Sequence, residues 1–124
     1  MAVYVDDMGL RADVQNGARI VSSRWCHLMA DTYAELEEFA RRLRLAPSWV
    51  QIKPSGVHYD LTEGKRRQAL ALGAVHLPIH QPGGVGLNSE WERVCAAARD
   101  QYETGLEGAR EAPHKSPSGG RWDS

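Results

Sequence analysis

Residues 24–44 read RWCHLMADTYAELEEFARRLR, in which an apolar segment runs directly into an amphipathic helix. Thr32 and Glu35 are three residues apart, the spacing of a capping box at a helix N-terminus. The apolar side chains behind them recur at helical spacing, and they are Tyr33, Leu36, Phe39, Ala40 and Leu43. The pattern predicts a helix over residues 32–44, ended by Pro47.

Strand and helix signals alternate on both sides of this helix. Before it, Ala2-Val3-Tyr4-Val5 predicts a first strand, and residues 19–23, which follow turn signals at Asn16-Gly17, predict a second that leads into residues 24–31. After it, the sequence predicts extended segments over 48–52, 57–61 and 74–80, a helix over 62–72 closed by Gly73, and a helix from Ser89 that frays near Gly105. The alternation favours the α/β class, with helices packed on a small sheet.

The composition is that of one ordinary domain. The chain has 124 residues, of which 42% are hydrophobic and 25% charged. From Arg110 onward it is rich in Pro, Ser, Gly, Lys and Arg, too poor in apolar side chains to offset the entropy of ordering. We therefore expect a single α/β domain over residues 1–109 and a disordered, mobile tail over 110–124.

Charge and the pattern of apolar residues exclude several classes of protein. Fifteen basic and sixteen acidic residues give a net charge of -1, which argues against a polyanion binder that acts through bulk charge. The longest apolar runs are far shorter than a bilayer requires, and the N-terminus does not resemble a signal peptide. Cys26 and Cys95 make no disulfide framework, so the cytoplasm is the expected compartment.

Acidic and imidazole side chains follow three separate extended segments. In open α/β sheets, ligands bind beyond the carboxyl ends of the strands. We expect Asp6, His27, His58 and Asp60 to meet there and to hold a divalent cation, either magnesium, manganese or zinc. The alternatives are that Asp60 and Asp31 only cap helices and that His58 is a buried histidine with satisfied hydrogen bonds.

Further polar and aromatic residues flank this predicted site. Asp7 and Asp31 are candidates for general base or for support of the ligands. Arg66 and Thr62, the cap of the predicted helix, are candidates for ligand binding, with Arg66 binding a phosphate, against the alternative of a solvated helix face. Trp25 and Tyr59 are candidates for stacking on a nucleobase, against the alternative of core packing.

Three ordered motifs resemble one known family. They are Val3-Tyr4-Val5-Asp6-Asp7, then Trp25-Cys26-His27-Leu28 with Ala30-Asp31, then His58-Tyr59-Asp60-Leu61-Thr62 with Arg66 and Gly73-Ala74. In these motifs the chain resembles the uncharacterised family called domain of unknown function 4031, which occurs in bacteria and their phages. The resemblance covers residues 2–76 and implies no reaction, but it singles out the same residues as the strand-end argument.

Three functions are compatible with these features. The first is a metal-assisted hydrolase acting on a phosphate-containing substrate, either a nucleotide or a nucleic-acid end. The second is a module that binds a nucleotide-like ligand without chemistry, as a sponge or sensor in phage and host defence. The third is a protein-interaction domain that uses the Trp91 helix or the Trp122 tail. A homodimer stands as an alternative to a monomer in each case.

Overall fold

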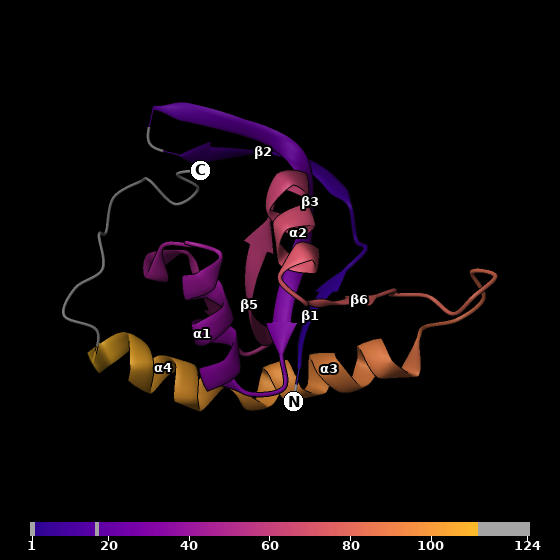
Figure 1. Cartoon of the computed structure of the whole chain (residues 1–124). Helices are drawn as coiled ribbons and strands as arrows, with labels where there is room; N and C mark the ends of the chain where they lie inside the picture. Colours follow the sequence, from indigo (N-terminus) through magenta and orange to yellow (C-terminus); the bar gives the residue numbers. More distant parts are fainter. Residues whose placement is uncertain (1, 17, 112–124) are drawn as a thin grey trace.

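A computed structural model of the chain describes residues 2–16 and 18–111 and has the predicted α/β class (Figure 1). Its strands are β1 (Val3–Asp6), β2 (Leu10–Asn16), β3 (Arg19–Ala30), β4 (Gln51–Lys53), β5 (Gly56–Leu61) and β6 (Val75–Leu77). Its helices are α1 (Tyr33–Arg42), the short 3-10 helix η1 (Pro47–Trp49), α2 (Glu63–Ala71), α3 (Ser89–Asp100) and α4 (Tyr102–Glu111). None of these helices is long and apolar enough to cross a membrane.

The strands form one mixed sheet. Its order is β4-β5-β3-β1-β6, and β2 pairs with β3 outside this path. β1 and β6 are parallel, whereas β3 runs antiparallel to β1, β2 and β5, and β4 antiparallel to β5. The long strand β3 is therefore the centre of the fold, and it runs opposite to β1 and β5, the neighbours on its two sides.

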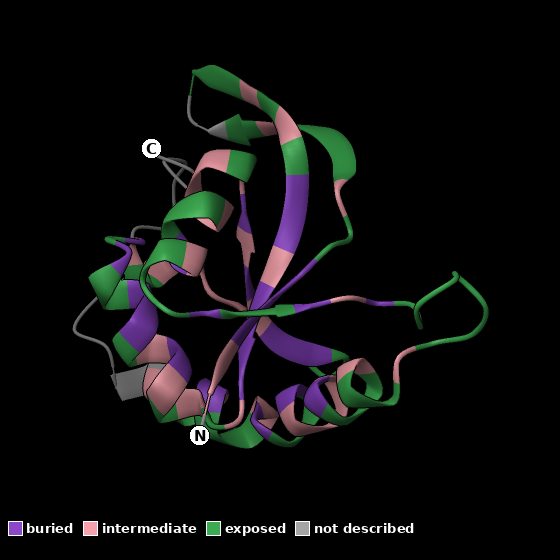
Figure 2. Cartoon of the chain, turned by 45° about the vertical axis from the view of Figure 1, so that its right-hand side comes forward, coloured by how far each residue is buried: buried purple, intermediate pink, exposed green. Residues whose placement is uncertain are grey.

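Helices cover both faces of the sheet. On one face, α1 and α2 pack on a large apolar cluster that includes Val5, Leu28 and Tyr59. On the other, α3 packs on a smaller cluster that includes Tyr4, Met29 and Val94. Figure 2 shows that the buried parts of the strands lie at the middle of the molecule, between these helices. Alternate residues of β1 and β3 thus face different layers, as the pleat of a strand requires.

The predicted caps of α1 and α2 are confirmed, whereas α3 is capped by Asn88 and not, as the sequence suggested, by Ser89. Thr32 caps α1, where its hydroxyl accepts a hydrogen bond from the Glu35 backbone N–H at 3.2 Å. Thr62 caps α2 in the same way through the Lys65 N–H, also at 3.2 Å. Both contacts satisfy a backbone donor that the first helical turn leaves without an intrahelical partner.

The structure corrects the prediction in the first hairpin. Residues 10–16 form β2, which the sequence did not reveal, and residues 19–30 form a single strand. This outer part of the sheet is poorly buried, with Leu10 62% and Ile20 64% exposed. An exposed hairpin does not need alternating apolar residues, so its sequence lacks the period that identifies a half-buried strand.

The C-terminal helices also differ from the expectation. The helix from Ser89 ends at Asp100, and α4 continues to Glu111, beyond both the predicted fraying at Gly105 and the predicted domain end at 109. Gly105 packs so closely that a Cβ there would lie 3.2 Å from Ile52 Cγ2. It therefore marks a close helix contact instead of a helix end. The predicted mobile tail falls, from residue 112 onward, outside the described residues.

Candidate metal centre

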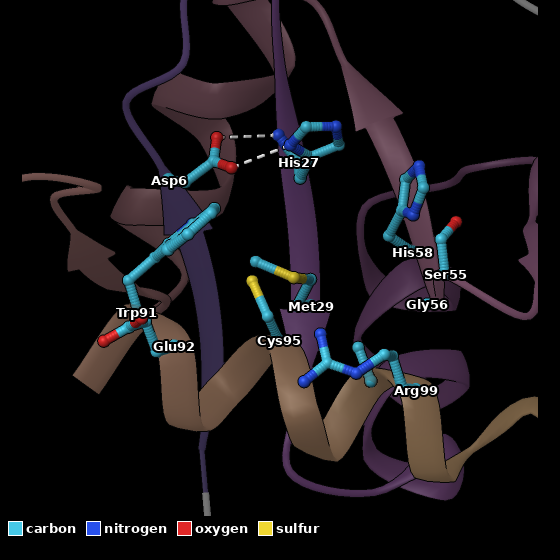
Figure 3. A pocket seen from close by; sticks show the side chains of 11 residues that line it. Asp6, His27, Met29, Ser55, Gly56, His58, Trp91, Glu92, Cys95 and Arg99 are labelled. Carbon is cyan, nitrogen blue, oxygen red and sulfur yellow. Dashed lines mark hydrogen bonds and ion pairs between the residues drawn. The ribbon is translucent and has the colours of Figure 1, made fainter. Parts of the chain in front are cut away.

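Three polar side chains lie side by side across β1, β3 and β5. His27 pairs with Asp60 in the β3–β5 register, and the β1–β3 register, which pairs Val5 with Leu28, continues with Asp6 opposite His27. Asp6 and His27 face α3 (Figure 3). Asp60 lies on the same face of the sheet because it pairs with His27, and so does His58, two residues before it on β5. The register therefore brings together the four residues proposed from the sequence as metal ligands.

Asp6 and His27 form a tightly bonded pair (Figure 3). The Asp6 carboxylate is fully buried, and its Oδ2 lies 2.7 Å from His27 Nδ1. Its Oδ1 accepts from the backbone N–H groups of His27 at 3.0 Å and Met8 at 3.2 Å. Both carboxylate oxygens are thus used within the fold, and they orient the imidazole so that Nε2 points away from Asp6.

The pair shifts the pKa of both groups. Burial acts to raise the pKa of Asp6, but the hydrogen bond with His27 outweighs it, and the pKa lies below its ordinary value. Burial likewise acts to lower the pKa of His27, but the Asp6 carboxylate outweighs it, and the pKa is raised. A basic, oriented imidazole is the form in which histidine makes a strong metal ligand once a cation displaces its proton.

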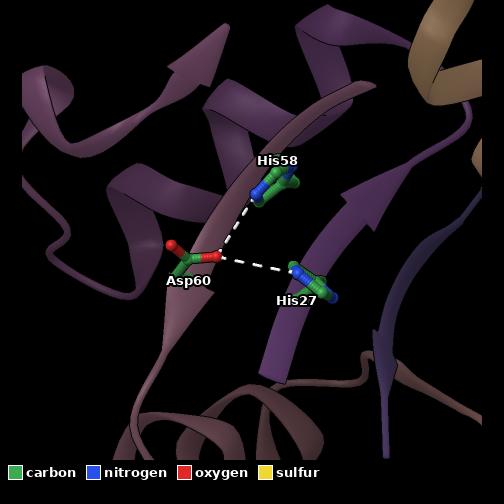
Figure 4. Close-up of side chains that lie close together, drawn as sticks. All are labelled: His27, His58 and Asp60. Carbon is green, nitrogen blue, oxygen red and sulfur yellow. Dashed lines mark ion pairs between the residues drawn. The ribbon is translucent and has the colours of Figure 1, made fainter. Parts of the chain in front are cut away.

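His27, His58 and Asp60 converge on one point (Figure 4). Asp60 Oδ1 lies 3.2 Å from His58 Nε2 and 3.9 Å from His27 Nε2, and one donor atom from each residue lies within 4.8 Å of the others. The two imidazole rings meet edge to face, with centroids 4.7 Å apart. Burial acts to raise the pKa of Asp60, but its hydrogen bond with His58 and the two imidazoles lower it, so the carboxylate is ionised.

A cavity of about 410 Å³ opens beside these residues. Asp6, His27, Met29 and His58 line it from the sheet, and Ser55 and Gly56 from the turn between β4 and β5. The opposite wall is α3, which contributes Trp91, Glu92, Cys95, Ala98 and Arg99 (Figure 3). The histidines are therefore accessible to a small molecule, which a purely structural histidine pair does not require.

The physical reason for this convergence differs from the one that predicted it. The sequence argument placed the residues at the carboxyl ends of strands, which holds for Asp6 on β1 and Asp60 on β5, but β3 is antiparallel to both. His27 lies before the end of β3, and it meets Asp6 and Asp60 through strand register. Because β3 is antiparallel to β1, the last residue of β3, Ala30, lies beside the start of β1, at the end of the sheet away from Asp6.

Asp31 and Asp7, proposed as bases, do not lie among the cavity residues. Asp31 follows the end of β3 and contacts the start of β1, where its carboxylate accepts from the Ala2 N–H at 3.0 Å and the Tyr4 hydroxyl at 3.1 Å. Asp7 accepts from the Ile79 N–H at 2.9 Å and lines a different hollow, beside α2. Both carboxylates thus have structural contacts away from the histidines.

The residues proposed for ligand binding lie on the α1 and α2 side of the sheet or in its core. Tyr59 is buried, with its hydroxyl bonded to Glu37, and the Trp25 indole donates to the Ala12 carbonyl at 2.9 Å. Thr62 is used as the cap of α2. The structure therefore brings neither aromatic ring to the cavity.

Arg66 is also held within the fold. Its Nε donates to the Asp6 carbonyl at 3.0 Å, and its Nη2 donates to His76 Nδ1 at 2.7 Å. It lines the hollow beside α2 together with Asp7 and His76. Arg66 thus stabilises the end of β1 through the Asp6 carbonyl. The arginine that lines the cavity with the histidines is Arg99.

The wall formed by α3 is what sequence reasoning missed. Trp91 and Cys95 are recognisable from the sequence only as members of an apolar helix stripe, a pattern typical of core packing. Arg99 continues that stripe at the same spacing. A charged residue at this position is the one sequence signal that the C-terminal end of the stripe is exposed.

Comparison with known families agrees with the resemblance in the motifs. The family described as "Protein of unknown function (DUF4031)" matches residues 3–83, more than half of the chain. The chain belongs to this family. Comparison with curated proteins and with solved structures gives no match. The matched region contains Asp6, His27, His58 and Asp60, whereas α3, the opposite wall of the cavity, lies beyond it.

Proposed function

We propose that this protein is a metal-dependent hydrolase whose cation is bound by His27, His58 and Asp60. The observation that carries the proposal is the convergence of two imidazole nitrogens and one carboxylate oxygen within 4.8 Å, beside an open cavity. Three protein ligands with a free position for water are the usual arrangement of catalytic zinc sites.

The donor set favours zinc over magnesium. Magnesium prefers oxygen ligands and retains several waters, whereas zinc binds imidazole readily, and manganese lies between them. Two histidines and one aspartate also match the facial arrangement that binds non-haem iron(II). We expect the affinity to rank zinc above manganese and manganese above magnesium.

Asp6 orients the proposed ligand His27. Through the 2.7 Å contact it holds the proton of His27 on Nδ1, so that the Nε2 lone pair is available for the cation. Asp6 is in this proposal a positioning residue, since both its oxygens are already bonded to protein N–H groups.

The reaction that fits this arrangement is hydrolysis of a phosphate ester. A bound divalent cation lowers the pKa of a water molecule and offsets the charge of a phosphate. The water would lose a proton as its oxygen bonds to phosphorus, the ester P–O bond would break, and the leaving oxygen would take up that proton. The free cavity space beside His27 and His58 is where the reacting phosphate would lie.

Metal binding tests the proposal without knowledge of the substrate. Each metal is titrated against the purified full chain, and the melting temperature is recorded. Zinc at a hundred times its dissociation constant adds about 2.7 kcal/mol to the free energy of unfolding. His58→Ala and Asp60→Asn abolish this gain. His80→Ala, which removes an exposed imidazole outside the cavity, retains it.

Two results contradict the proposal. One is an unchanged melting temperature with every metal. The other is an equal gain in the wild type and in His58→Ala. Stabilisation by a nucleotide, combined with no effect of any metal, favours the ligand-binding module instead.

A further inference from the structure

The α3 wall of the cavity has an apolar end and a cationic end, and its one carboxylate, Glu92, lies next to Trp91 at the apolar end. Trp91, Cys95 and Arg99 are spaced four residues apart, so they lie on one face of the helix. At about 1.5 Å of rise per residue, the stripe is on the order of 12 Å long. Figure 3 shows the Trp91 ring directed toward Asp6 at one end and Arg99 below His58 and Ser55 at the other.

Arg99 is a cation without a bound carboxylate. Within residues 2–16 and 18–111 it forms neither an ion pair nor a hydrogen bond. By contrast, Arg93 on the same helix bonds Glu90 and the Tyr4 hydroxyl, and Arg66 bonds Asp6 and His76. A guanidinium at the wall of a cavity, with its donors unused, is suited to bind an anion.

The other end of the wall is apolar and aromatic. Trp91 borders the cavity beside Met29 and Cys95. The indole N–H is buried and has no acceptor among the described residues, so the ring offers the cavity chiefly an apolar surface. A flat ring is the group that such a surface binds best, by stacking or by edge contact.

We infer that Arg99 anchors the phosphate of a nucleotide-sized substrate whose ring lies against Trp91, with the metal centre on the facing sheet. This inference rests on the proposed function, which it deepens by naming the substrate class. The volume of about 410 Å³ is that of a small-molecule site. The net charge of -1 argues against a long nucleic acid as the natural ligand.

Binding of adenosine monophosphate (AMP) and of adenosine tests the inference separately from catalysis. Both are titrated into the full chain in EDTA, where no metal chemistry occurs, and the tryptophan indole N–H signals are followed by NMR. AMP binds at least tenfold more tightly than adenosine and shifts the signal that Trp91→Phe removes. Arg99→Ala weakens AMP binding ten- to a hundredfold, the size expected for lost hydrogen bonds to a charged group.

Matched controls separate the possible failures. Arg67→Ala removes the same charge from an exposed position on α2, outside the cavity, and leaves AMP binding unchanged. Arg99→Ala also leaves zinc binding unchanged, because Arg99 is not among the metal donors. If the wild type bound no zinc, the proposed function would be overturned, even if AMP still bound through Arg99.

Three outcomes overturn the inference itself. They are no AMP binding by the wild type, equal AMP affinity in Arg99→Ala and the wild type, and a shifted indole signal other than that of Trp91. Tighter binding of a short 5′-phosphorylated oligonucleotide than of AMP would show that the phosphate belongs to a nucleic-acid end.

Discussion

At the scale of single residues, the account depends on how Asp6 holds His27. A neutral amide at position 6 offers one acceptor atom where the carboxylate offers two, and it removes the charge that makes His27 basic. Asp6→Asn therefore lowers zinc affinity by about 10- to 100-fold, the range found for partners behind a metal ligand. Isothermal titration with zinc measures the loss.

Asp13→Asn is the matched control for Asp6→Asn. It makes the same chemical change on the exposed hairpin strand β2 and leaves zinc affinity unchanged. Equal zinc affinity in Asp6→Asn and the wild type would show that His27 needs no partner behind it, and the assigned role of Asp6 would be wrong.

The same pair predicts how the stability of the metal-free protein depends on pH. The raised pKa of His27 adds stability that is fully present below its ordinary value of 6.5 and is lost as pH rises through the folded pKa. The lowered pKa of Asp6 adds stability that is present above 3.8 and is lost as pH falls through the folded pKa. The pair therefore stabilises the fold most between these two ordinary values.

Urea unfolding of wild type and His27→Gln in EDTA checks this dependence. The free energy of unfolding lost on substitution is larger near pH 5.5 than near pH 9, because the charged fraction of the wild-type imidazole falls as the pH rises. A loss that is the same at both pH values would mean that the Asp6–His27 pair is not ionic.

At the scale of elements, α4 depends on a glycine contact. A Cβ on Gly105 would lie 3.2 Å from Ile52 Cγ2 and 3.5 Å from Tyr33 Cε1. Gly105→Val overpacks this contact and lowers the free energy of unfolding by about 1–3 kcal/mol. Gly64→Val, where the nearest atom is 3.9 Å away in α2, changes it by only a few tenths. Urea denaturation compares the two, and equal effects would show that α4 does not pack on Ile52.

The elements also show what a sequence can and cannot reveal. Helix α1 was predictable because Thr32 caps it and its buried side chains recur at one period. Strand β2 was not, because an exposed hairpin has no buried face to impose alternation. The end of α3 at Asp100 was missed because residues 89–111 retain helix-forming composition. The break lies at Gln101, which is buried and donates a hydrogen bond to the Ala30 carbonyl, a tertiary contact that the local sequence does not reveal.

At the scale of the whole molecule, the two walls of the cavity differ in how far they were predictable. Asp6, His27, His58 and Asp60 could be proposed because acid and imidazole recur near strand ends, although His27 meets the others through the antiparallel register of β3 and not at the end of its strand. The opposite wall could not, because the spacing of Trp91, Cys95 and Arg99 is typical of any amphipathic helix. The family match, which ends at residue 83, has the same division.

Anomalous diffraction at the zinc edge, from crystals of the full chain grown with zinc, tests the metal centre most directly. The account predicts one strong peak about 2.0–2.2 Å from His27 Nε2, His58 Nε2 and an Asp60 oxygen, with a further position open to the cavity. Asp6 remains bonded to His27 Nδ1. A peak at other residues, or saturating zinc with no peak between these three side chains, would contradict the account.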